Sequence, residues 1–174
     1  MKNLYKFLLI ILFIFLNKVA HSETTVAYID MQTIILQSDA GQKIKKRLEE
    51  THKQNLIEFK ETETNLKEEE KKILSQKNIL KEDEFKIKIT ELRKKANNYN
   101  LKRKLKIESL HKLKTDSTNA ILNKLNPILA EYSIENSIAL IIQKKVVVIG
   151  KKDLDITNEV LNIFNSKVKD IELK

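Results

Sequence analysis

The sequence predicts an α+β protein, mostly α, in which a long antiparallel helical hairpin stands on a small β body. The first observation is a stretch of 85 residues, 42–126, that contains no glycine or proline, the residues that most strongly interrupt helices. The second is a stripe of side chains at alternating spacings of three and four along that stretch. The third is a set of short, β-branched segments near both ends of the chain, which are typical of strands.

The first 22 residues are predicted to be a secretory signal peptide. Lys2 and Lys6 precede an unbroken apolar run at 7–16, and Ala20-His21-Ser22 has the small-x-small form of a cleavage site. The alternative, a membrane anchor, is disfavoured because the run is well short of the roughly 20 residues that a span needs. The chain has no cysteine, which excludes a disulfide and a lipoprotein anchor. The mature protein is therefore predicted to be soluble in a bacterial periplasm.

Residues 23–41 are predicted to form the first part of the body. Thr25 to Ile29 has the β-branched and aromatic composition of a strand. Asp30 follows as the expected cap of a brief helix, and Ser38 caps the next helix. The brief helix contains the apolar residues Met31, Ile34 and Ile35.

Residues 42–126 are predicted to fold into two helical arms. The helix reversal is expected between residues 75 and 84, where Asn78 and an acidic cluster interrupt the pattern and leave the arms nearly equal in length. Only about half of the first arm's seam positions are apolar, so the seam should be thin and the hairpin should bend easily. The predicted seam consists of Leu48, His52, Asn55, Phe59, Thr62, Leu66, Glu69 and Ile73 in the first arm and Phe85, Ile89, Leu92, Ala96, Tyr99, Arg103, Lys106, Leu110 and Leu113 in the second.

Residues 127–174 are predicted to complete the body with two strands and a helix. Ile138 to Ile142 and Val146 to Ile149 are dense in isoleucine and valine and suggest a β-hairpin that ends at Gly150. Asp155 or Thr157 is expected to cap the last helix. One face of that helix is apolar and contains Val160, Leu161, Phe164, Val168 and Ile171.

Three short strands bury little apolar surface and leave sheet edges uncovered. A closed homo-oligomer would solve both problems if strands from several copies formed a shared barrel. The residues predicted to build this oligomer body are Val26, Tyr28, Ile138, Leu140, Ile142, Val146 and Val148.

The second arm is predicted to attract an acidic or anionic partner. Without Lys2, Lys6 and Lys18 of the signal peptide, the chain keeps 30 basic and 24 acidic side chains, a net charge of +6. From Lys86 to Lys114 the sequence has eleven basic residues and only two acidic ones, Glu91 and Glu108. The alternative is an ordinary solvated helix face. The basic residues proposed to contact a client are Arg93, Lys94, Lys95, Lys102, Arg103, Lys104 and Lys106.

The order of these features resembles the Skp family of periplasmic chaperones, also called OmpH. The resemblance rests on Val26-Ala27-Tyr28-Ile29-Asp30-Met31-Gln32, on Ser38-Asp39-Ala40-Gly41, on the charged arm without glycine or proline, and on Asp155-Ile156-Thr157-Asn158-Glu159-Val160-Leu161. It covers the whole mature chain. It implies a homotrimer whose β body is completed by trimerisation and whose helical tentacles surround a cavity.

The resemblance also implies the function. Proteins of that family hold unfolded outer-membrane proteins in the cavity without ATP and without catalysis. The resemblance also implies contact with anionic lipid or lipopolysaccharide, but it assigns no particular residues of this chain to that contact. Apolar side chains of the arms could face such a client, although the favoured alternative is that they only fill the seam. The six are Phe59, Leu66, Ile73, Phe85, Ile89 and Leu92.

Other functions are less favoured by the sequence. The basic arm would suit nucleic acid, but export argues against that partner in the cell. A structural coiled-coil spacer would need a better-filled seam. His52 and His111 fall at the same level of the hairpin, yet a zinc or pH role is disfavoured against two ordinary helix histidines. No catalytic, metal or cofactor site is predicted, and the protein is not expected to be an enzyme.

Overall fold

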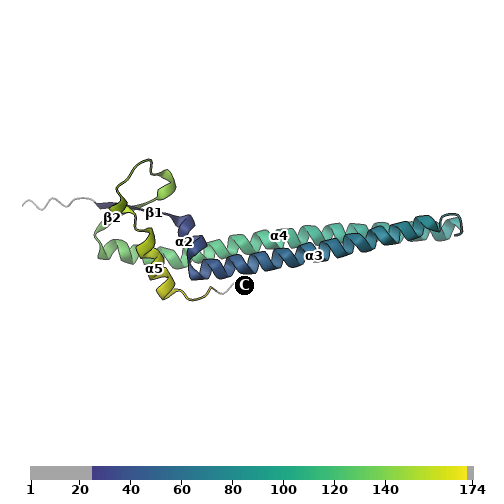
Figure 1. The fold of residues 1–174 in the computed structure, drawn as a ribbon, viewed down its shortest axis with the longest axis horizontal. Helices are drawn as coiled ribbons and strands as arrows, with labels where there is room; N and C mark the ends of the chain where they lie inside the picture. The colour runs from purple at the N-terminus through teal and green to yellow at the C-terminus, as the bar shows by residue number, and fades with distance from the viewer. Residues whose placement is uncertain (1–24, 172–174) are drawn as a thin grey trace, which may run out of the picture.

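The structure is a computed structural model that describes residues 25–171, and it has the form of a rod with a small body at one end (Figure 1). The predicted fold class, mostly α with a small β part, is confirmed. The predicted signal peptide lies outside the described residues. The body contains β1 (Thr25–Ile29), α2 (Met31–Gln37), β2 (Ile138–Gln143) and α5 (Thr157–Lys167), and the hairpin consists of α3 (Asp39–Ser75) and α4 (Glu82–Glu135).

Both predicted caps at the start of the chain are confirmed. The Asp30 carboxylate accepts a hydrogen bond of 3.0 Å from the backbone N–H of Thr33 and so caps α2. The Ser38 hydroxyl accepts one of 3.1 Å from the N–H of Gly41 and caps α3. A Cβ atom at Gly41 would lie only 1.9 Å from the carbonyl oxygen of Ile35. The glycine therefore allows α2 and α3 to approach closely where they join.

The helix reversal occupies residues 76–81, between the end of α3 and the start of α4. Glu82, Asp83 and Glu84 form the first turn of α4 rather than part of the connection. Carboxylates in a first turn compensate the positive end of the helix dipole. The acidic cluster therefore stabilises the start of the second arm.

The helix α4 continues through Pro127 to Glu135, past the expected end of the arm at Asn126. A proline inside a helix removes one hydrogen bond and crowds the preceding turn. On either side of it, however, Leu125 and Ile128 are buried in the body core. The burial of these side chains offsets the cost of the proline, which a reading of helix propensity alone could not reveal.

The body core is assembled from both ends of the chain and from the roots of the two arms. The helix α5 packs against α2 and α4, and its Val160 and Phe164 are completely buried. Val168 and Ile171 lie beyond the end of α5 but remain buried, so the chain stays against the core after the helix ends. The principal other core residues are Ala27, Ile29, Ile34, Ala40, Ile44, Ile121, Leu125, Ile128 and Ile156.

The predicted β-hairpin of residues 138–142 and 146–149 is wrong. The strand β2 pairs in parallel with β1, while residues 144–146 form one turn of 3-10 helix and Val148 and Ile149 are exposed. The chain after β2 instead folds over Tyr28, whose hydroxyl donates a hydrogen bond of 3.1 Å to the carbonyl of Lys151. The edge of β1 offers β2 a partner within the same chain, whereas residues 146–149 pair with no strand within residues 25–171, and of the four only Val147 is half-buried.

A polar network joins the end of β1 to the start of α5. The N–H of Asp30 donates to the Thr157 hydroxyl at 2.9 Å, and that hydroxyl in turn donates to the Asp155 carboxylate at 2.5 Å. Lys144, just after β2, forms an ion pair of 2.7 Å with Asp155. The prediction that Asp155 or Thr157 caps the last helix is wrong, because α5 is preceded by Ile156 and has no side-chain cap. The two side chains instead join the start of α5 to the end of β1.

We expect the free energy of unfolding to decrease as the pH falls below about 4. The hydrogen bond from the backbone N–H of Thr33 lowers the pKa of Asp30. Burial raises the pKa of Asp155, but hydrogen bonds from Lys144 and Thr157 outweigh it and leave that pKa lowered. Both carboxyls thus have a lower pKa folded than unfolded, so their contribution is present above the unfolded value of about 4 and is lost as the pH falls through the folded values.

Urea unfolding between about pH 7 and pH 3 measures this dependence. Replacement of Asp155 by Asn should flatten it, because one of the two linked protons is removed. An Asp155→Asn variant with an unchanged pH dependence would show that the carboxyl contributes nothing.

Candidate functional site

The seam between the arms is arranged as predicted. Phe59 and Ile73 are buried, and all other predicted seam positions are half-buried except His52 and Arg103, which are exposed. Polar residues such as Asn55, Thr62 and Glu69 occupy seam positions, so the thinness of the seam is a real property of the hairpin.

The six apolar side chains predicted as client contacts lie in this seam. Two are buried and four are half-buried between the arms, which favours the alternative that they hold the hairpin together. Contact between these residues and a client stays a prediction. The six are Phe59, Leu66, Ile73, Phe85, Ile89 and Leu92.

Three aromatic and basic side chains connect the arms in the middle of the hairpin. The rings of Phe59 and Tyr99 meet edge to face at 6.3 Å between centroids, and the Arg103 guanidinium lies 5.5 Å from the centre of the Phe59 ring. The Tyr99 hydroxyl donates a hydrogen bond of 2.5 Å to Glu63 across the seam. Burial raises the pKa of Tyr99, and the bond to Glu63 raises it further. We call Phe59, Tyr99 and Arg103 the mid-arm clamp.

The predicted basic residues divide into engaged and free side chains. Lys95 pairs with Glu69 at 2.6 Å, Lys106 pairs with Glu58, and Arg103 belongs to the mid-arm clamp. Lys104 lies 3.8 Å from Glu108 in its own helix. Within residues 25–171 the remaining three have no ion pair, and all three are exposed: Arg93, Lys94 and Lys102. These three are therefore the side chains of the predicted set that can meet an anionic partner without giving up an ion pair or a contact of the mid-arm clamp.

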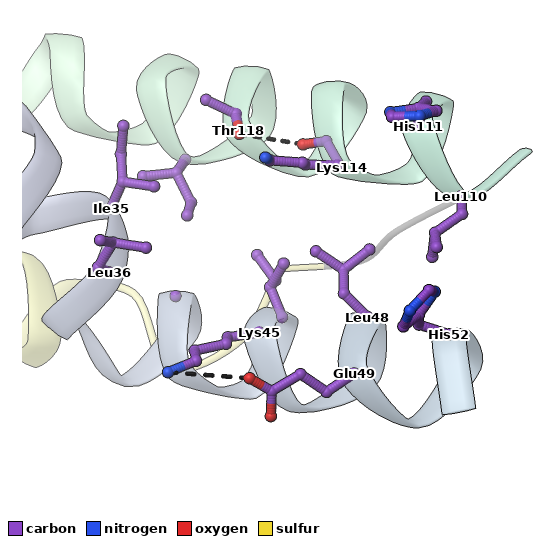
Figure 2. A pocket seen from close by; sticks show the side chains of 13 residues that line it. Ile35, Leu36, Lys45, Leu48, Glu49, His52, Leu110, His111, Lys114 and Thr118 are labelled. Carbon is purple, nitrogen blue, oxygen red and sulfur yellow. Dashed lines mark hydrogen bonds and ion pairs between the residues drawn. The ribbon is translucent and has the colours of Figure 1, made fainter. Parts of the chain in front are cut away.

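An apolar groove lies at the root of the hairpin and is lined by the two arms and α2 (Figure 2). Its volume is about 420 Å³. Figure 2 shows Leu48 of α3 and Leu110 of α4 projecting into it, with Ile35 and Leu36 of α2 at the body end. We call this cavity the root groove. The remaining lining residues are Gly41, Ile44, Lys45, Glu49, His52, His111, Lys114, Thr118 and Ile121.

His52 and His111 both line the root groove, which confirms that they share a level of the hairpin. Glu49 also lines it but lies 3.8 Å from Lys45. Among residues 25–171 no group of three or more potential ligands is arranged to hold a metal ion. The two histidines therefore border an apolar surface rather than a recognisable metal centre.

Sequence reasoning missed a set of large apolar side chains that the arms leave exposed. They lie beside the seam, not in it, so the spacing of three and four does not select them. They could have been found in the sequence by listing the apolar residues of the arms that are not seam positions. In the root half of the arms they are Leu56, Ile57, Leu105 and Ile107, at the level of the mid-arm clamp Leu101, and toward the tip Leu74 and Ile87, while Ile79 is exposed in the reversal itself.

The residues predicted to build an oligomer body differ in their exposure. Tyr28 is buried within the chain, and Ile138 and Ile142 are half-buried. Val26, Leu140, Val146 and Val148 are exposed, and Val146 and Val148 belong to the connection after β2 instead of a strand. An exposed apolar surface thus remains on the body.

None of the described helices is both long and apolar enough to cross a membrane. The family model of the OmpH-like outer membrane proteins matches residues 25–164, nearly the whole described part of the chain. The chain belongs to the OmpH-like family. The resemblance that the sequence motifs suggested is thereby confirmed.

A solved structure agrees with this OmpH-like assignment. It is the crystal structure of a proposed OmpH-like outer membrane chaperone from Caulobacter crescentus CB15, which matches this chain with a TM-score of 0.79. The two are 18% identical, and the match covers 84% of this chain and 87% of that one. At this identity the likeness shows the OmpH-like fold alone. No curated protein matches the sequence.

Proposed function

We propose that this OmpH-like chain is an ATP-independent periplasmic chaperone that holds unfolded outer-membrane proteins and prevents their aggregation. The observation that carries this proposal is the exposed apolar and basic surface of a hairpin whose seam is only partly filled. A flexible rod with many weak contacts can cover a variable client, whereas a spacer would need a fuller seam. Membership of the OmpH-like family supports the same reading.

The active form is proposed to be a homotrimer. Two strands and a few short helices leave Leu140, Val146 and Val148 exposed on the body, and further copies could cover them. Three hairpins projecting from a shared body would enclose the client. Export by a cleaved signal peptide would bring the protein to the periplasm, where these clients pass.

Light scattering after size exclusion, combined with an aggregation assay, tests the proposal. The mature chain should be a trimer, and it should keep a urea-diluted outer-membrane β-barrel protein in solution at about one trimer per client. A monomer without holding activity would refute the proposal. A stiff oligomer that leaves the client to aggregate would point to the spacer instead.

Charge reversal of the free basic residues should weaken capture of an acidic client at low salt. The variant is Arg93→Glu, Lys94→Glu and Lys102→Glu, which breaks no cross-arm ion pair within residues 25–171 and should leave the hairpin folded. We expect affinity to fall roughly tenfold at low salt and less at high salt, because exposed charges are screened.

The matched control changes the net charge equally in the body, by Lys145→Glu, Lys151→Glu and Lys152→Glu. All three of these side chains are exposed. Equal losses in both variants would mean that only total charge matters, and the basic arm would then have no particular role.

A further inference from the structure

We propose that the hairpin has one client-holding side, the side onto which the root groove opens. This inference rests on the proposed chaperone function. The ligand is an extended polypeptide segment that carries apolar side chains and net negative charge. The surface consists of the root groove together with Leu56 and Ile107, and we call it the apolar track.

The root groove continues along both arms through rows of side chains spaced four apart. On α3, His52 lines the groove and Leu56 follows one turn later on the same face. On α4, His111 lines the groove and Ile107 lies one turn before it. Leu56 is 52% exposed and Ile107 is 39% exposed. The two side chains therefore extend the groove on its own side of the hairpin.

Contacts across the seam place Leu56 and Ile107 at the same level. Glu58 pairs with Lys106, and the Arg103 guanidinium lies over the Phe59 ring. Glu58 and Phe59 are close to Leu56 in sequence, and Lys106 and Arg103 are close to Ile107. The apolar track thus begins at α2 and ends at the mid-arm clamp.

The opposite flank of the hairpin has one exposed large apolar side chain at this level, Leu105, beside polar residues. In a two-helix seam, the residue after one seam position and the residue before the next lie on opposite flanks. Leu56 and Glu58 are such a pair on α3, between seam positions 55 and 59, and Ile107 and Ser109 are such a pair on α4. The flank of Leu56 and Ile107 leads into the root groove. The opposite flank has Glu58, Ser109 and the exposed Leu105, and none of these three lines the groove.

The charges beside the apolar track are mainly positive. Lys53 and Lys60 lie three and four residues from Leu56, are exposed, and make no ion pair within residues 25–171. Lys114 lines the groove, while the acidic Glu49 there is held near Lys45. Positive charge complements acidic side chains of a client. The same positive charge would repel the apolar track of a second copy, because that copy carries the same charges.

An extended chain fits the track better than a flat membrane does. The track lies in a groove between two helices, which a bilayer surface cannot enter but a single strand can. Alternate side chains of an extended strand are about 6.7 Å apart. Rows on a helix repeat about every 6 Å at a spacing of four residues. Successive apolar side chains of the client can therefore meet successive turns such as Leu48, His52 and Leu56.

Paired substitutions test the inference. Leu56→Gln with Ile107→Gln removes apolar surface from the track, and Leu74→Gln with Ile87→Gln is the matched control, with the same residue types at 53% and 58% exposure near the tip. All four positions are exposed in helices and glutamine is a good helix former, so folding should persist. The probe is a fluorescent outer-membrane β-barrel protein diluted from urea. We expect about tenfold weaker binding for the track variant and less than twofold for the control.

Failure of the inference and failure of the chaperone function give different results. If the unsubstituted chain does not bind the unfolded probe, the proposed function fails. If it binds and the two double variants behave alike, only the track is refuted. A photo-crosslinking residue at position 56 should capture the probe and one at Ser109 should not, and equal capture at both would also refute the track.

Two further measurements distinguish other occupants. Light scattering should give the track variant the same oligomeric state as the unsubstituted chain, and a change would mean that a second copy occupies the track. Binding to anionic phospholipid vesicles should be equal for both double variants. Selective loss of vesicle binding with intact client binding would assign the surface to lipid and overturn the proposal.

Discussion

Replacement of Phe164 by Ala should destabilise the protein by roughly 3–5 kcal/mol, the usual cost of truncating a buried phenylalanine. Phe164 is completely buried where α5 packs against α2 and α4. The cavity left behind would be shared by three helices that are anchored elsewhere, so the site can collapse only in part. Because domains are typically stable by about 5–15 kcal/mol, a loss of this size would unfold much of the body under mild conditions.

Urea unfolding followed by circular dichroism measures this effect, at one fixed protein concentration because oligomerisation would shift the midpoint. Asn162→Ala, an exposed position in the same helix, is the control and should change stability by less than about 0.5 kcal/mol. Similar midpoints for the Phe164 variant and the control would contradict the assigned core.

Replacement of Phe59 by Ala should loosen the arms without unfolding the body. Phe59 is the buried centre of the mid-arm clamp, where it meets Tyr99 edge to face and lies under Arg103. We expect a loss of about 2–3 kcal/mol, below the full core value because a two-helix seam lets water and neighbouring side chains fill the gap. The neighbouring seam positions are polar and cannot compensate.

Amide hydrogen exchange resolves where this loss occurs. Protection should fall in the arms on both sides of position 59 and stay unchanged in the body core. Phe59→Leu keeps most of the volume but removes the aromatic contacts, so its effect should be about 1 kcal/mol. Unchanged protection of the arms in the alanine variant would mean that the clamp does not hold them together.

The hairpin could be predicted from the sequence because its signals are local. The absence of glycine and proline, the spacing of three and four, and the caps at Asp30 and Ser38 each act over one or two helical turns. Even the alignment of His52 with His111 follows from simple counting once the reversal is located. Local chemistry therefore defined the arms and their seam.

The body and the surface could not be predicted in the same way. The segment 146–149 has strand composition, but a strand needs a partner. The partner of residues 138–143 is β1, which is far away in the sequence, so local composition does not reveal the pairing. Helix α4 passes Pro127 because Leu125 and Ile128 are buried, again a tertiary effect. The apolar track arises from side chains that the seam does not use, so a search for regular spacing overlooks them.

The parallel pairing of β1 with β2 also determines when the molecule can fold. The sheet cannot form from residues 25–29 until residues 138–143 are available, so a chain that is made N-terminus first carries an unpaired strand until most of it has been made. The arms need only neighbours and can fold early, and their folding brings the two strand segments together and shortens the effective loop between them. The hairpin thus assists the assembly of the body that later carries it, and a truncated chain ending at Glu135 should form helical arms but no body.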